Sequence, residues 1–256
     1  MTVRIDKRPG AERESRTPEK IQSLSSGAIG TVTDAVKDAA GGAIRAVKPR
    51  LRGWIHAFTA PLALAACIVL TVLAPGPALT WACAAYLACS LFLFANSGVY
   101  HISYGHWPRR VTTVLQRVDH ANIYLLIAGT YTPLSVALLD RGMTLLVLGI
   151  VWGGALAGII TSLAWRSAPR WLTTLFYILL GWVAIWFLPQ FWMTGGPAIV
   201  WLLVSGGVVY TVGGAVYARR WPDPDPRWFG FHEIFHTCTV AAWACQCTAC
   251  YLAVLG

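Results

Sequence analysis

Residues 53 to 73 read GWIHAFTAPLALAACIVLTVL, and this stretch decides the class of fold. It contains no Lys, Arg, Asp or Glu, and its single histidine, His56, lies near the start. A helix needs about 20 mostly apolar residues to cross the hydrocarbon core of a bilayer, and it satisfies its own backbone hydrogen bonds there. The stretch therefore predicts a transmembrane helix that ends at Pro75-Gly76-Pro77.

The rest of the chain repeats this pattern. The 256 residues are 56% hydrophobic and only 12% charged, whereas soluble domains are about 25% charged. We expect an all-α membrane protein, a seven-transmembrane helix bundle. The predicted spans are about Gly53–Leu73, Leu79–His101, Asp119–Leu139, Gly142–Ala164, Trp171–Phe187, Pro197–Ala218 and Phe231–Leu255.

The net charge of +9 does not indicate nucleic-acid binding, because the basic residues lie at the ends of apolar runs. The chain divides into a polar arm, residues 1–50, and a membrane domain, residues 51–256. Within the arm, apolar side chains recur near helical spacing from Val32 to Val47, which predicts a short helix on the membrane surface. Membrane lipids are the expected partners, and the sequence leaves the oligomeric state open.

Basic and basic-poor loops alternate along the chain. Ala74–Ala78 and Pro189–Gly196 hold no Lys or Arg, whereas the loops near Arg109, Arg166 and Arg219 are basic. Basic loops stay on the cytoplasmic side. This predicts a cytoplasmic N-terminus and an external C-terminus.

This topology places all six histidines at the cytoplasmic ends of the spans. They are His56, His101, His106, His120, His232 and His236. Asp119 and Glu233 fall at the same ends. Ionisable groups near the bilayer are costly, so such a cluster is a candidate functional site.

The spacing within this cluster predicts a zinc site. His232 and His236 are four residues apart, so they share one helical face and can bind one metal. His101 could be the third ligand. Ser97 lies on the same face of its helix, one turn away. Asp119 could hold or deprotonate a metal-bound water, or it could instead cap the start of the third span.

His232-Glu233-Ile234-Phe235-His236 also reads as H-E-x-x-H, the signature of zinc metalloproteases, in which the glutamate is the general base. An intramembrane metalloprotease is therefore an alternative. Ser97-x-x-x-His101 and Asp119 supply ligand candidates that such a protease does not need.

Three segments resemble the bacterial haemolysin III proteins, which belong with the progestin and adipoQ receptors. They are residues 97–101, SGVYH, residues 117–133, RVDHANIYLLIAGTYTP, and residues 231–236, FHEIFH. The resemblance covers about residues 50 to 256. It implies seven spans in a bacterial plasma membrane, a cytoplasmic N-terminus, and a zinc near the cytoplasmic face.

By motif position the resemblance implies zinc ligands at His101, His232 and His236, with Asp119 holding the zinc water and Ser97 as the motif serine. Two positions depart from the eukaryotic members, which carry Asn where this chain has Arg52 and His where it has Gln246.

Three functions follow as hypotheses. The first is a zinc-dependent hydrolase of a lipid amide or ester, because the related alkaline ceramidases hydrolyse a lipid amide. The second is a non-enzymatic membrane protein, involved in signalling or cytolysis, whose zinc is structural. The third is the intramembrane metalloprotease.

Overall fold

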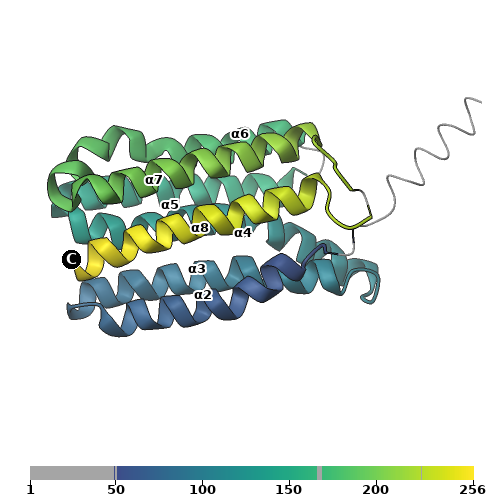
Figure 1. The fold of residues 1–256 in the computed structure, drawn as a ribbon, viewed down its shortest axis with the longest axis horizontal. Helices are drawn as coiled ribbons and strands as arrows, with labels where there is room; N and C mark the ends of the chain where they lie inside the picture. Colours follow the sequence, from purple (N-terminus) through teal and green to yellow (C-terminus); the bar gives the residue numbers. More distant parts are fainter. Residues whose placement is uncertain (1–48, 50, 166–168, 226) are drawn as a thin grey trace, which may run out of the picture. The chain divides into compact units, whose positions relative to one another are not determined.

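The computed structural model describes residue 49 and residues 51–165, 169–225 and 227–256. The surface helix predicted between Val32 and Val47 lies outside these residues. All named elements of the described part are helices (Figure 1). They are α2 (Trp54–Leu73), α3 (Gly76–Ile102), α4 (Arg109–Leu138), α5 (Arg141–Ala164), α6 (Arg170–Gly181), the 3-10 helix η1 (Trp182–Phe187), α7 (Leu188–Arg219) and α8 (Phe231–Leu255).

Six helical segments of the described chain are long and apolar enough to cross a membrane: α2, α3, α4, α5, α8 and the continuous stretch Arg170–Arg219. Their outward faces are apolar. Phe58 is 67% exposed, Trp186 is 79% exposed and Met193 is 85% exposed. Water-soluble proteins rarely expose so many large apolar side chains, whereas lipid solvates them. The prediction of an all-α, multi-pass membrane protein is confirmed.

Helix α4 begins earlier than the sequence predicted. The apolar run suggested a start at Asp119, but the helix begins at Arg109, directly after Pro108. Hydropathy marks where a helix enters the bilayer, and the helix itself continues through polar residues that water can solvate. Asp119 lies almost three turns inside α4. The alternative prediction that it caps the third span is therefore wrong.

The predicted loop Pro189–Gly196 is also mostly helical. α6, η1 and α7 follow one another without a gap, and within α7 only Gly196 leaves helical geometry, with a φ of 81°. Glycine tolerates this left-handed conformation because it has no Cβ. The break at Gly196 replaces the eight-residue loop.

The chain turns back on itself across this break. A Cβ on Gly214 would lie 3.1 Å from Thr174, and a Cβ on Gly207 would lie 3.6 Å from Trp182. From the first pair to the second, the residue number falls along α7 and rises along α6 and η1. The two halves of Arg170–Arg219 are therefore antiparallel neighbours, as the ribbon shows (Figure 1).

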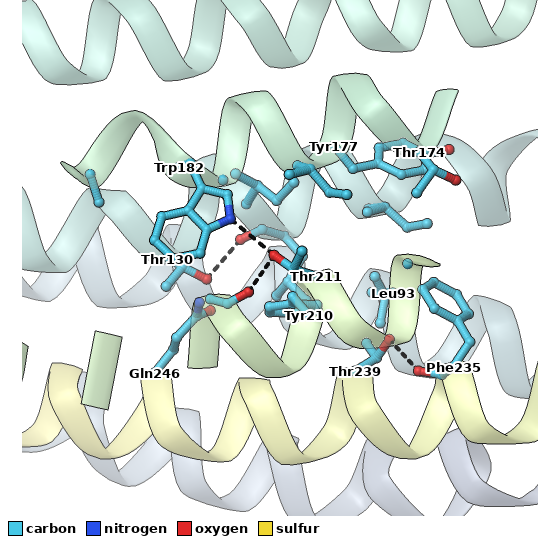
Figure 2. Close-up of a pocket in the computed structure, with 18 of the residues that line it drawn as sticks. Leu93, Thr130, Thr174, Tyr177, Trp182, Tyr210, Thr211, Phe235, Thr239 and Gln246 are labelled. Carbon is cyan, nitrogen blue, oxygen red and sulfur yellow. Dashed lines mark hydrogen bonds between the residues drawn. The ribbon is translucent and has the colours of Figure 1, made fainter. Parts of the chain in front are cut away.

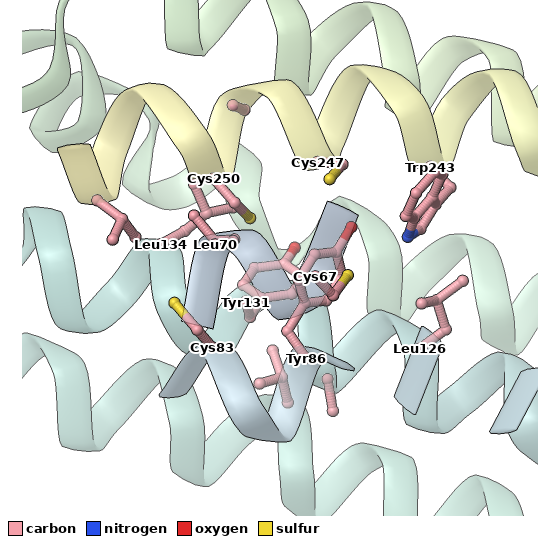
Figure 3. Packing of buried hydrophobic residues seen from close by; sticks show 14 of the residues in the cluster. Cys67, Leu70, Cys83, Tyr86, Leu126, Tyr131, Leu134, Trp243, Cys247 and Cys250 are labelled. Carbon is pink, nitrogen blue, oxygen red and sulfur yellow. The ribbon is translucent and has the colours of Figure 1, made fainter. Parts of the chain in front are cut away.

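Small and apolar residues hold the helices together. Figure 3 shows Cys67 of α2, Tyr86 of α3 and Cys247 of α8 among the buried side chains of the core. Between α3 and α4, a Cβ on Gly129 would come within 2.6 Å of the Cβ of Cys89. Lipid offers no hydrophobic drive between helices, so such close packing of small residues is what associates them.

Candidate metal centre

The histidines predicted to act together come from helix ends that meet at one end of the bundle. His101 is the last but one residue of α3, and His232 and His236 lie in the first two turns of α8. Helix α8 starts sharply because Glu233, in its first turn, accepts a hydrogen bond from the backbone N–H of Gly230 at 2.9 Å. This start leaves the two α8 histidines one turn apart on one face.

The three side chains form a compact set of nitrogen donors. One ring nitrogen from each of His101, His232 and His236 lies within 4.8 Å of the others. The Nε2 atoms of His101 and His232 are 3.3 Å apart. Two nitrogens bound to a tetrahedral zinc at about 2.05 Å would also be about 3.3 Å apart. The cluster can therefore hold a metal ion, and the donor set fits zinc.

Asp119 and Ser97 lie beside this cluster. The Oδ2 atom of Asp119 is 3.6 Å from Nε2 of His101. Ser97, one turn before His101 on α3, lines the same cavity as Asp119. The Asp119 side chain is 12% exposed. It therefore faces open space while it touches the histidine cluster.

His56 is a site residue that sequence reasoning left undecided. Its ring stacks on His236 with centroids 3.8 Å apart and planes 9° from parallel. It is buried, and neither ring nitrogen has a hydrogen-bond partner among the described residues. The stacking fixes the plane of the His236 ring, which is a candidate metal ligand. The only signal in the sequence was that His56 shares a membrane end with the other histidines.

His120, also left undecided, lines the same cavity as Asp119. Glu233 does not join the cluster. Its Oε1 accepts a hydrogen bond from Nε of Arg52 at 2.9 Å, and its Oε2 accepts the bond from Gly230. The side chain is 1% exposed. Both carboxylate oxygens are thus engaged in holding the start of α8.

A long cavity extends from the histidine cluster into the bundle. It encloses about 1420 Å³ of space, part of which is open to the surroundings. Along α4 its lining extends from Asp119 to Leu134, which is about 22 Å of helix. Apolar side chains dominate its wall, and Figure 2 shows the part between α4, η1, α7 and α8. The cavity has the shape and polarity of a site for a chain-like apolar ligand with a polar end.

Comparison with known proteins agrees with these features. The chain is 32% identical over 142 residues to the "Hemolysin-3 homolog" of Bacillus subtilis (strain 168), a match that covers 55% of this chain and 65% of that protein. It is 36% identical over 110 residues to "Hemolysin-3" of Bacillus cereus, covering 42% of this chain and 49% of that protein. The matched parts thus span about half to two thirds of these curated relatives. The family described as "Haemolysin-III related" matches residues 44–247, and the chain therefore belongs to the haemolysin-III related family.

Proposed function

We propose that this protein is a zinc-dependent membrane hydrolase that cleaves a lipid amide or ester. The observation that carries the proposal is the position of three converging histidines and one carboxylate at the polar end of a long apolar cavity. His101, His232 and His236 would hold the zinc. When bound, zinc polarises a carbonyl group and acidifies the water beside it.

The chain's own residues supply the other requirements of hydrolysis. Asp119 is placed to accept a proton, since its carboxylate reaches both the histidine cluster and the cavity. The Ser97 hydroxyl can donate a hydrogen bond to the carbonyl oxygen as negative charge develops on it. The apolar wall holds the hydrocarbon chain and aligns the scissile bond with these groups.

Metal analysis and a lipid-hydrolysis screen on the purified protein test this proposal together. The wild type should carry about one zinc per chain, and a chelator should abolish hydrolysis of long-chain lipid amides. His101→Ala and His236→Ala should lose both metal and activity. His106→Ala is the matched control, because His106 is exposed and lies outside the cluster. Hydrolysis that survives complete removal of zinc would contradict the proposal.

A non-enzymatic protein with structural zinc is the second candidate. Structural zinc sites are closed by four protein ligands, whereas catalytic sites keep a position open. X-ray absorption spectroscopy of the zinc-loaded protein separates the two. Three histidine nitrogens and one oxygen ligand that added anions can displace from the zinc would support the hydrolase. Direct Asp119 ligation that leaves no exchangeable position would support the structural role.

The metalloprotease hypothesis receives no support from the surroundings of Glu233. A general base needs a free carboxylate oxygen near the reacting water. Both oxygens of Glu233 are already hydrogen-bonded, to Arg52 and Gly230.

We further propose seven crossings of a bacterial plasma membrane, with a cytoplasmic N-terminus, an external C-terminus and the zinc near the cytoplasmic face. The antiparallel halves of Arg170–Arg219 support two crossings within that segment. The basic loops at the histidine end support its cytoplasmic location.

A further inference from the structure

Polar side chains gather a second time, deep inside the cavity. Thr130 of α4, Trp182 of η1, Thr211 of α7 and Gln246 of α8 line it at a similar depth in Figure 2, and we call these four residues the polar belt. Gln246 is ten residues beyond His236 on the same helix, about 15 Å further from the histidine cluster. The cavity therefore has a second polar region, distinct from the histidine cluster.

Three members of the belt are already hydrogen-bonded. Trp182 Nε1 donates to Thr211 Oγ1 at 2.9 Å, and that hydroxyl donates to the carbonyl of Gly207 at 2.7 Å. Thr130 Oγ1 donates to the carbonyl of Leu126 at 2.8 Å. Each hydroxyl donor is thus used within its own helix. The oxygen of Thr130 keeps capacity to accept a further bond.

Gln246 differs from these three. Its amide is half-buried and lines the cavity, and it makes no hydrogen bond to another residue of the described chain. Beside the belt, on α7, the hydroxyl of Tyr210 is buried and has no hydrogen-bond partner among the described residues. Polar groups in membrane helices normally bond across a helix interface. At the level of the belt, one amide and one hydroxyl line the cavity without joining helices; the Thr174 hydroxyl, elsewhere in the lining, is likewise without a partner among the described residues.

An unpaired amide inside an apolar cavity is costly unless something in the cavity pairs with it. We propose that the polar belt, with the neighbouring Tyr210, is a second recognition site, which binds a hydroxyl or carbonyl oxygen carried on the hydrocarbon chain of the lipid ligand. Gln246 and Tyr210 can each donate and accept, so they suit a hydroxyl group best. The preferred ligand is a lipid with a polar end at the histidines and an oxygen-bearing chain.

The distance between the two polar regions sets the position of this oxygen. An extended chain gains about 3.6 Å per three bonds, so about 15 Å corresponds to about 12 bonds. A hydroxyl near carbon 12 of a fatty acyl chain would reach the belt when the acyl carbonyl lies at the histidine cluster.

This inference rests on the proposed lipid-binding role of the cavity, but it does not require hydrolysis. The test is therefore a binding measurement. The full chain in nanodiscs is titrated with octadecanoic acid and with the same acid carrying a hydroxyl at about carbon 12, each competing with a fluorescent fatty acid. Neither acid contains an amide or ester, so turnover cannot distort the result.

The wild type should bind the hydroxylated acid about tenfold more tightly than the plain acid, as one net hydrogen bond implies. Gln246→Leu should lose this preference through weaker binding of the hydroxylated acid, with unchanged or tighter binding of the plain acid. Gln190→Leu is the matched control, because Gln190 is an α7 glutamine that is not part of the cavity lining; it should keep the preference.

Equal affinities in the wild type, or a preference that survives in Gln246→Leu, would overturn the inference and indicate that water occupies the belt. Binding preference without any hydrolysis would leave the inference intact and would contradict only the proposed function.

Discussion

At the scale of single residues, two acidic side chains near the histidine cluster have opposite surroundings. Asp119 touches His101 and faces the cavity. Glu233 is shut between Arg52 and the backbone of Gly230. A carboxylate that faces the cavity can exchange protons with a ligand, whereas one with both oxygens bonded stabilises structure. The two acids therefore have different effects when they are neutralised.

Asp119→Asn should keep the zinc and lower the rate of lipid-amide hydrolysis by about 10² to 10⁴-fold, the usual contribution of a positioned general base. Metal content and kcat/KM measure the two effects. Asp140→Asn is the control, because Asp140 caps α5 by accepting hydrogen bonds from Gly142 and Met143, and Asn caps equally well. An unchanged rate in Asp119→Asn would contradict the assigned role.

Glu233→Gln should reduce stability and leave the chemistry in place. Loss of the partner of Arg52 should cost about 1–3 kcal/mol, at the lower end for a buried pair because Arg52 is 20% exposed. Thermal unfolding of Glu233→Gln, Arg52→Gln and the double variant measures this cost. The double variant should lose less than the two single losses added together. A folded, zinc-loaded Glu233→Gln protein without activity would instead favour the protease.

At the scale of helices, the length of each apolar run predicted the position of the spans. It did not predict the start of α4 or the break within α7. The first and last spans were predicted within one residue, because their apolar runs and helices coincide. The start of α4 was missed since its first turns are polar, and the break at Gly196 was missed since a left-handed glycine has no hydropathy signature.

In the candidate site too, the sequence predicts contacts within one helix but not contacts between helices. The spacing of His232 and His236 predicts that they meet, because both lie on one helix. Their contact with His101 depends on how α3 packs against α8, which periodicity does not encode. The stacking of His56 on His236 is likewise a property of packing, so the sequence could only place it nearby.

Gly129→Ala should destabilise the protein by about 1–3 kcal/mol, because the added Cβ would overlap the Cβ of Cys89 and force α3 and α4 apart. Gly149→Ala in α5 makes the same chemical change where nothing lies within 4 Å of the new Cβ. It should be neutral or slightly stabilising. Thermal unfolding in one detergent compares the pair, and equal shifts would rule out close packing at Gly129 as the cause.

At the scale of the whole molecule, the number of crossings decides on which side the chain ends. If Arg170–Arg219 crosses the membrane twice, the chain has seven spans and its ends lie on opposite sides. If that segment crosses once, both ends lie on the same side. The side of the membrane on which the C-terminus lies therefore tests whether Arg170–Arg219 crosses twice.

Alkaline phosphatase fused after Gly256 should be active, and green fluorescent protein at the same position should be dark, because the first works only outside the cytoplasm and the second fluoresces only within it. Fusions after Gly105, in the loop between α3 and α4, should give the reverse pattern and serve as the control. A bright fluorescent fusion after Gly256 would contradict seven spans with a cytoplasmic N-terminus.

The distribution of the three histidines has a consequence for biosynthesis. His101 is on the second helix described here, whereas His232 and His236 are on the last, α8. A nascent chain emerging from the ribosome therefore carries one of the three donors until residue 232 has been added, and it carries all three only once residue 236 has been added. The three-histidine cluster can therefore hold a metal ion only after the start of α8 has been made and has packed beside α3, so metal loading would report that both ends of the bundle have come together.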